Sequence, residues 1–237
     1  MIRKQVASPE AAVAGIGDGA VVMVGGFGPP GQPVELIEAV LDSGAKDLTI
    51  INNNAAAGGE AIARLFADKR VAKVICSFPK AIGSTVFDDL YLAGEIELEL
   101  VPQGTLAERI RAAGAGIAAF YTRTGYGTEL TQGKPVQKFG GKTYVLEEAL
   151  HADFALVKAY QADPWGNLTY RKTARNFGPL MLAAAKTAVV EVDEIVPLGA
   201  IDPEHVVTPG IYVDRVVQAS SASGVGQDRA MMEGVVA

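Results

Sequence analysis

The sequence predicts an α/β protein built on an open, mostly parallel β-sheet that is flanked by helices. Short β-branched runs alternate with helical patterns, with strands expected at 20–24, 48–51, 71–75 and 96–101 and helices at 33–44, 59–68, 83–93 and 104–114. Such alternation is typical of βαβ units, in which successive strands are parallel. A chain of 237 residues also fits one domain of this class, because it buries roughly 70% of the surface exposed by its unfolded form.

The helix expected at 33–44 has well-marked boundaries. Pro33 stands where a first-turn proline is tolerated, and Gly44 follows the last apolar residue of the pattern. Apolar residues between them recur at mixed spacings of three and four, which predicts one buried helix face.

A glycine pair marks an antiparallel excursion in the second half of the chain. The stretch PVQKFGGKTYVL places two strand-like runs around Gly140-Gly141, a pair that can supply the positive φ angles of a tight hairpin turn. Further buried strands are expected at 153–157 and 187–192. We expect one domain over 1–218 and a flexible, Ser- and Gly-rich C-terminal tail over 219–237.

The composition argues against several classes of protein. A net charge of −6 and a pI near 5.0 disfavour a nucleic-acid-binding protein, which needs clustered Lys and Arg. No apolar run reaches the roughly 18 residues of a membrane-spanning helix. The N-terminal MIRKQVASPE has no apolar segment behind it, so no secretory signal is expected. These observations predict a cytoplasmic protein without a membrane or nucleic-acid partner.

Three residues with reactive side chains are interpreted as structural. Cys76 lies in the apolar run VAKVICSF and is expected to be a buried strand residue rather than a catalytic thiol. His151 and His205 have no Cys or carboxylate partner at the spacing of metal ligands, so no metal site is expected.

The run GGFGPPG at 25–31 has the G-x-G-x-x-G spacing of a dinucleotide-binding loop, but its surroundings argue against that function. Pro29 and Pro30 have no N–H group to offer a pyrophosphate, and they delay the following helix. The acidic residue required about 20 positions further on is replaced by Asn52-Asn53-Asn54. The glycines suit a stiff loop whose backbone approaches a ligand closely, or a tight turn without a ligand.

Two further polar segments follow predicted strands. Asn52-Asn53-Asn54 ends one strand, and Pro102-Gln103-Gly104-Thr105 ends another. Because the carboxyl ends of parallel strands form the ligand crevice of an open sheet, we expect these segments and the loop at 25–31 to form one site.

Much of the chain resembles the coenzyme A transferases of the 3-oxoacid type. The residues DGAVVMVGGFGPPGQP at 18–33 look like the first signature of that family without a gap. The resemblance continues through Asn53-Asn54, CSFP at 76–79, PQGTLAER at 102–109, TGYGT at 124–128, WGNLTYR at 165–171 and ARNFGP at 174–179. It covers the chain to about Val217 and implies the coenzyme A transferase fold.

The resemblance implies an A (alpha) chain that works with a B subunit in an A2B2 heterotetramer. These enzymes use a glutamate nucleophile in a Ser-Glu-Asn-Gly-like motif of the B subunit, and no Glu-Asn dipeptide occurs in this chain. A carboxylate nucleophile splits the thioester exchange into successive acyl transfers, so the partner is expected to supply it. A CoA thioester is then a substrate, and no permanently bound cofactor is expected.

The resemblance also assigns roles to individual residues. The CoA site is implied to be lined by Gly25, Gly26, Phe27, Gly28, Pro29, Pro30 and Gly31. Asn53 is implied to donate a side-chain N–H to the oxyanion on the attacked carbonyl; the alternative is an asparagine that shapes the turn. Gln103 and Gly104 are implied to face the acyl group. Arg171, Lys172 and Arg175 could hold CoA phosphates or form a solvated or subunit-facing basic patch.

The stretch WGNLTYRKTARNFGPLMLAAAKTAV is most similar to alpha chains that move CoA from succinyl-CoA to 3-oxoadipate, with acetoacetate-type enzymes as near relatives. Arg123 stands where proline is usual in the family. Its guanidinium could bind the second carboxylate of 3-oxoadipate, and the alternative is a solvent-exposed loop arginine. A nicotinamide oxidoreductase and a sugar-phosphate-isomerase-like relative of the same fold are the rival functions.

Overall fold

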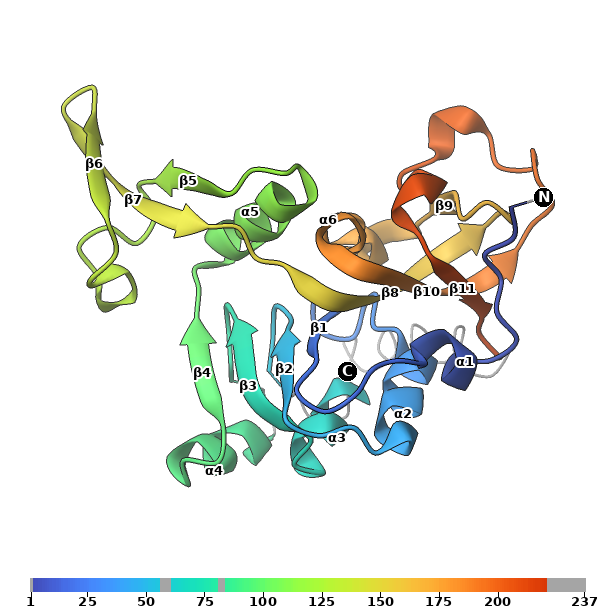
Figure 1. Ribbon diagram of the computed structural model, residues 1–237, viewed down its shortest axis with the longest axis horizontal. Helices are drawn as coiled ribbons and strands as arrows, with labels where there is room; N and C mark the ends of the chain where they lie inside the picture. The colour runs from blue at the N-terminus through green and yellow to red at the C-terminus, as the bar shows by residue number, and fades with distance from the viewer. Residues whose placement is uncertain (1, 56–60, 81–83, 221–237) are drawn as a thin grey trace, which may run out of the picture.

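The structure is a computed structural model, and it describes residues 2–55, 61–80 and 84–220. A large sheet forms its centre (Figure 1). Its strands, in spatial order, are β11 (Arg215–Gln218), β10 (Ala185–Ile195), β8 (Ala152–Ala162), β1 (Val21–Val24), β2 (Leu48–Ile51), β3 (Val71–Cys76) and β4 (Glu97–Leu100). These neighbours all pair in parallel, and the short β9 (Leu168–Thr169) runs antiparallel beside β8. The predicted open, mostly parallel sheet is confirmed.

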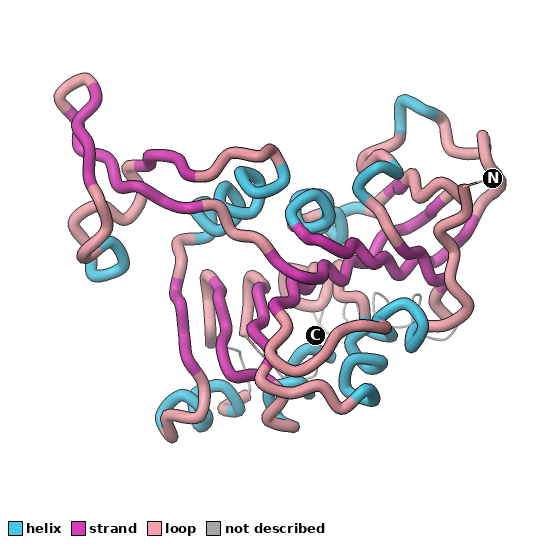
Figure 2. The backbone as a smooth tube through the Cα atoms, viewed as in Figure 1, coloured by secondary structure: helices cyan, strands magenta, loops and turns pink. Residues whose placement is uncertain are grey.

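Helices cover both faces of this sheet, as Figure 2 also shows. One face carries α1 (Pro9–Val13), α2 (Val34–Ser43), α3 (Ala61–Ala67) and α4 (Val86–Leu92), and the other carries α5 (Gln103–Gly114) and α6 (Gly178–Ala184). Short 3-10 turns lie at η1 (Glu129–Thr131), η2 (Lys172–Arg175), η3 (Pro203–His205) and η4 (Gly210–Tyr212). Because side chains alternate along a strand, β1 contributes Val22 and Val24 to one core and Met23 to the other.

The strand order places β1 at the centre of the site. The chain moves outward from β1 to β4 on one side, and β8 then pairs with β1 on the other side. Ligands of open α/β sheets bind at the carboxyl ends of the strands where the order reverses in this way. The segment 25–31, called the glycine loop below, leaves β1 at that point.

A smaller antiparallel sheet projects from the main body (Figure 1). It has the order β5 (Ala119–Thr122), β7 (Lys142–Glu148), β6 (Val136–Phe139). Gly140 and Gly141 connect β6 to β7 with φ angles of 56° and 75°, so the predicted hairpin is confirmed. The sequence did not predict β5, which completes this sheet.

The strands expected at 153–157 and 187–192 are confirmed as the cores of β8 and β10, but both strands are longer than expected, with 11 residues each. Their carboxyl halves alternate apolar with charged or polar residues, which hid them from a search for apolar runs. The helix α6 and the edge strand β11 were also not predicted. Apart from Ala219 and Ser220, the tail expected at 219–237 lies outside the described residues. In the described ranges, no helix is long and apolar enough to cross a membrane.

Candidate active site

The glycine loop is held by side chains from two distant parts of the chain. The Gly26 N–H donates to Asn176 Oδ1 at 3.2 Å, and the Gly28 N–H donates to Asn54 Oδ1 at 3.2 Å. Asn176 also donates from Nδ2 to the Pro30 carbonyl at 3.0 Å. With φ angles of 124° at Gly26 and 60° at Gly28, the loop needs glycine at both positions. These contacts fix the loop before any ligand binds.

The glycine loop presents only part of its length to solvent. Phe27 and Pro30 are exposed, Gly28, Pro29 and Gly31 are half-buried, and Gly25 and Gly26 are buried. The Gly25 N–H donates to the Leu156 carbonyl of β8 at 2.8 Å, so this residue extends the sheet pairing rather than facing outward. A ligand would therefore meet the loop at its tip, between Phe27 and Gly31.

Asn53 is the centre of a polar network that joins three strand ends. Its Nδ2 donates to Asn54 Oδ1 at 2.9 Å, while its Oδ1 accepts from Ser77 Oγ at 2.8 Å and from Gln103 Nε2 at 2.9 Å. These residues follow β2, β3 and β4, respectively. Asn53 is 1% exposed, whereas Gln103 is exposed. The network therefore links the glycine loop, through Asn54, to the start of α5.

Gln103 and Gly104 form the first turn of α5. The first helical bond runs from the Leu106 N–H to the Pro102 carbonyl at 2.8 Å, so the N–H groups of Gln103 and Gly104 precede it. Both residues are exposed, and a Cβ built on Gly104 would meet no atom within 4 Å. This helix end combines free space with the positive end of the helix dipole, which favours negative charge.

Arg123 lies outside this network. It follows β5, its carbonyl accepts the Tyr126 N–H at 3.2 Å, and its side chain is exposed. The same turn approaches the site through Gly125, because a Cβ built there would lie 3.7 Å from Pro102 Cγ. The structure thus places Arg123 in a turn beside the start of α5, without a hydrogen bond between its side chain and the Asn53 network.

Glu191 on β10 caps the N-terminus of α2 from inside the protein. Its Oε2 accepts the Glu35 N–H at 2.9 Å and the Leu36 N–H at 3.2 Å, and its Oε1 accepts from Lys158 Nζ at 3.1 Å. In a dinucleotide-binding enzyme, the helix after the glycine motif offers these N–H groups to a phosphate. Here a side chain of the same protein uses them, which excludes the nicotinamide alternative.

The ion pair between Glu191 and Lys158 is buried and includes a third group. Burial raises the pKa of Glu191 against the opposing effect of Lys158. Burial alone would lower the pKa of Lys158, but Glu191 and Asp193 together raise it. Lys158 Nζ lies 2.7 Å from Asp193 Oδ1, so this cation balances two carboxylates. Breaking such a buried group costs stability, because a charge would remain without a partner.

Cys76 is buried in β3, as predicted. Burial raises the pKa of its thiol to about 12, so the thiolate that a nucleophile requires is almost absent at neutral pH. Across the part of the chain that the structure describes, no group of three His, Cys, Asp or Glu residues could hold a metal ion.

Comparison with known proteins identifies the family to which these features belong. Residues 6–219 match the family described as Coenzyme A transferase. The chain belongs to the coenzyme A transferase family. It is 59% identical, over 94% of its length and 96% of the relative, to the A chain of the 3-oxoadipate CoA-transferase of Pseudomonas putida. It is 51% identical, over 98% of its length and 95% of the relative, to the A chain of a succinyl-CoA:3-ketoacid coenzyme A transferase of Xanthomonas campestris pv. campestris (strain B100).

A solved structure agrees with the fold of this coenzyme A transferase. The apoenzyme of the acyl-CoA transferase YdiF from Escherichia coli O157:H7 matches 94% of this chain with a TM-score of 0.79 and 24% identity. The match covers 48% of that protein, so this chain spans about half its length. At this identity the likeness concerns the fold alone.

Sequence reasoning missed three residues that hold the site of this coenzyme A transferase together. Asn176 and Ser77 lie within the family-like stretches at 174–179 and 76–79, so the resemblance contained a signal for both. The signal for Glu191 was weaker: a single acidic residue inside the buried run AVVEV. A buried charge in a strand requires a partner, but the sequence does not say which one.

Proposed function

We propose that this chain is the alpha component of a 3-oxoacid CoA-transferase that moves CoA from succinyl-CoA to 3-oxoadipate. The proposal is supported above all by the 59% identity to the Pseudomonas putida chain over almost the full length of both proteins. The fixed glycine loop and the polar network beside it supply a site at the carboxyl ends of the strands. The CoA thioester is a substrate, no cofactor is bound permanently, and the enzyme is cytoplasmic.

A B subunit completes the active site in this proposal, and the assembly is A2B2. Both relatives are named as one lettered component of their enzymes, which supports a second kind of chain. Glu191 cannot serve as the nucleophile, because it is 1% exposed and both of its carboxylate oxygens are engaged. The partner therefore contributes the reactive glutamate.

The proposed reaction is a sequence of acyl transfers through that glutamate. Its carboxylate attacks the thioester carbonyl of succinyl-CoA, the C–S bond breaks, and a mixed anhydride and the CoA thiolate form. The thiolate then attacks the glutamyl carbonyl and releases succinate, which leaves a glutamyl-CoA thioester. The acceptor carboxylate reverses these steps and departs as the acyl-CoA. Each attack places negative charge on a carbonyl oxygen, so the site must stabilise an oxyanion repeatedly.

Asn53 is our candidate for that stabilisation. One of its amide N–H groups donates to Asn54, and we assign the second to the oxyanion. Because Asn53 is buried beneath the exposed Gln103, to which it is hydrogen-bonded, a substrate carbonyl reaches it after the Gln103 side chain turns aside. Gln103 and Gly104 then face the acyl group, and their N–H groups favour its carboxylate. The tip of the glycine loop lines the CoA arm.

The first test mixes this chain and a B subunit, each purified, with succinyl-CoA and 3-oxoadipate. We expect transfer only from the mixture, and a mass increase on the B subunit that corresponds to a glutamyl-CoA adduct. Turnover by this chain alone would overturn the assignment of the nucleophile to the partner.

The second test compares two neighbouring asparagines. Asn53→Ala should lower kcat by about 10²–10³ with a smaller change in CoA binding, because one oxyanion donor contributes about 2.7–4 kcal/mol. Asn52→Ala is the matched control: Asn52 is equally buried, but its Nδ2 donates to the Val24 carbonyl inside the fold. If both variants lose kcat equally, the role of Asn53 is structural.

The acceptor is tested by a direct competition between two 3-oxo acids. We expect a higher kcat/KM for 3-oxoadipate than for acetoacetate, because the second carboxylate finds a cation or several donors in the assembled site. Arg123→Ala should reduce this ratio if its guanidinium binds that carboxylate. A preference for acetoacetate would instead favour the succinyl-CoA:3-ketoacid function of the second relative. An unchanged ratio in Arg123→Ala would remove only the role of Arg123.

A further inference from the structure

Three cations without an acidic partner lie on one short turn beside the glycine loop. Arg171 precedes η2, and Lys172 and Arg175 begin and end it; we call these three residues the basic turn. All three are exposed, and none forms an ion pair with another described residue. In a chain with a net charge of −6, this cluster is a local reversal of sign. Such a reversal attracts an anionic ligand or partner.

The basic turn is fixed against the glycine loop. Asn176, which follows the turn, bonds to both Gly26 and Pro30. The two backbones also pass close together, since a Cβ built on Gly31 would lie 2.7 Å from the Ala174 carbonyl oxygen. The cations are therefore held beside the loop that we assign to the CoA arm.

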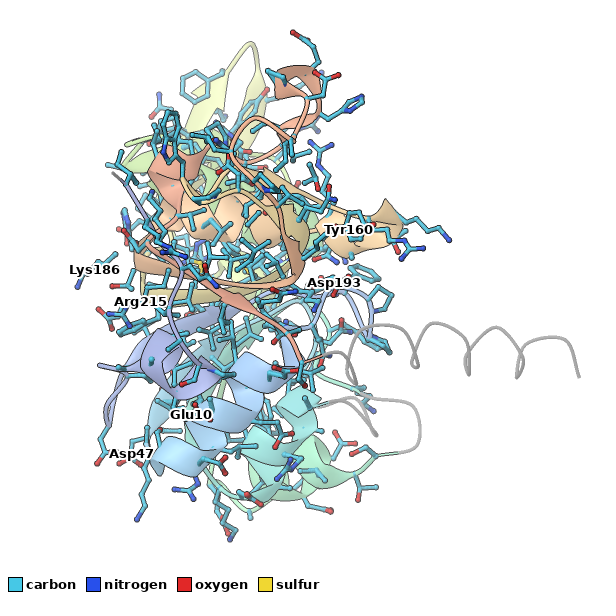
Figure 3. The ribbon with its side chains drawn as sticks, turned by 90° about the vertical axis from the view of Figure 1, so that its right-hand side faces the viewer. Glu10, Asp47, Tyr160, Lys186, Asp193 and Arg215 are labelled. Carbon is cyan, nitrogen blue, oxygen red and sulfur yellow. The ribbon has the colours of Figure 1, made fainter. Side chains whose placement is uncertain are left out.

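Two of the cations have defined positions within the turn. The Arg171 guanidinium lies 5.6 Å from the centre of the Tyr160 ring, a cation–π contact that orients it. Lys172 has a φ of 49°, a conformation that only a well-determined turn imposes on lysine. Figure 3 shows Tyr160 and Asp193 on one side of the molecule and Lys186 on the opposite side.

The order of the strands sets the distance from the reacting end of the site. Gln103 follows β4 and Asn53 follows β2, whereas Tyr160, beneath Arg171, lies on β8. Four strand intervals of about 4.8 Å separate β4 from β8, or about 19 Å in total. The glycine loop of β1 lies between them. CoA has matching extremes, because its thiol and its phosphate groups stand at opposite ends of an extended arm.

We propose that the basic turn binds the phosphate groups of CoA, while the thioester end reaches Asn53 and Gln103. This inference rests on the proposed function, from which it takes the identity of the ligand. Guanidinium groups bind phosphate through two parallel hydrogen bonds, and lysine adds a point charge. The alternative occupant is an acidic surface of the B subunit, and the experiment below separates the two.

The test removes the three charges together in the assembled A–B enzyme, as Arg171→Gln, Lys172→Gln and Arg175→Gln. The control removes three charges from the amino ends of the strands, as Lys46→Gln, Lys69→Gln and Lys186→Gln, so that both proteins have the same net charge. Calorimetric binding of CoA and of pantetheine is measured for each. The kcat/KM values for succinyl-CoA and succinyl-pantetheine are compared, because pantetheine lacks the phosphate groups under test.

We expect the basic-turn variant to bind CoA at least about tenfold more weakly, a loss of about 1.4 kcal/mol. Its kcat/KM for succinyl-CoA should fall by a similar factor, while the values for pantetheine and its thioester stay at those of the wild type and the control. Unchanged CoA affinity would overturn the proposal, as would an equal loss with both thioesters. Failure of the variant to co-elute with the B subunit would assign the turn to the interface between the two chains instead.

The same measurements separate this proposal from the proposed function. If the wild-type enzyme binds CoA through the basic turn but does not transfer it to 3-oxoadipate, the function fails and the phosphate site stands. If transfer occurs and the charges make no difference to CoA binding, the phosphate site fails and the function stands.

Discussion

Replacing Gly31 with alanine tests whether the close approach between the glycine loop and η2 is needed for stability and CoA binding. Gly31 has a φ of 86°, and an alanine Cβ would lie 2.7 Å from both the Ala174 carbonyl oxygen and Asn176 Nδ2. Gly44, at the end of α2, provides a matched control. Its φ is 79°, but a Cβ there would meet no atom within 4 Å. The two substitutions therefore share the conformational cost and differ in the collision.

The expected magnitudes follow from these contacts. A left-handed conformation costs an L-residue about 1–2 kcal/mol, and this is the whole effect expected for Gly44→Ala. Gly31→Ala should also displace the Asn176 side chain, which bonds to Gly26 and Pro30. Each lost hydrogen bond is worth about 1 kcal/mol, so we expect Gly31→Ala to be the more destabilising variant by about 2 kcal/mol. For a chain of this size that difference is about 4–8 °C in Tm.

Urea denaturation of both variants measures the free energies of unfolding, and steady-state kinetics with the B subunit measures KM for succinyl-CoA. We expect Gly31→Ala to raise KM and Gly44→Ala to leave it unchanged, since only Gly31 lies in the loop assigned to CoA. Equal free energies of unfolding for the two variants would refute the argument, because the collision would then have no cost.

Three further predictions concern buried or paired groups. Cys76, the single cysteine, should resist thiol reagents in the native protein at pH 8 and react rapidly in denaturant, because burial raises its pKa to about 12; rapid native labelling would contradict its burial. The Val21 N–H and then Lys186 hold the pKa of Asp153 below 3.8, so its stabilisation should be present above that pH and lost as the pH falls below it; acid unfolding curves of Asp153→Asn should lack this loss. Glu191→Gln should lower Tm by several degrees, because it leaves Lys158 with a weaker partner; an unchanged Tm would show that the pair is dispensable.

Much of the fold could be predicted because its signals are local. The β-branched runs at 20–24 and 48–51 and the helix ending at Gly44 depend on residues within a few positions of one another. The Gly140-Gly141 turn depends on two residues alone. The ends of β8 and β10 were missed because pairing between them, rather than apolar content, extends them as strands. Similarly, β5 becomes a strand only through its pairing with β7.

The site divides in the same way. The sequence by itself determined that polar segments follow the strands, that the glycine motif is unlike a dinucleotide loop, and that a Glu-Asn nucleophile motif is absent. Only the tertiary structure decided what holds these segments: Asn54 and Asn176 reach the glycine loop from 26 and 150 positions away, and Glu191 caps α2 from 155 positions away. Hydrogen bonds and ion pairs need their partners within a few ångströms, and for residues so far apart in sequence that proximity arises only from the order of the strands in the sheet.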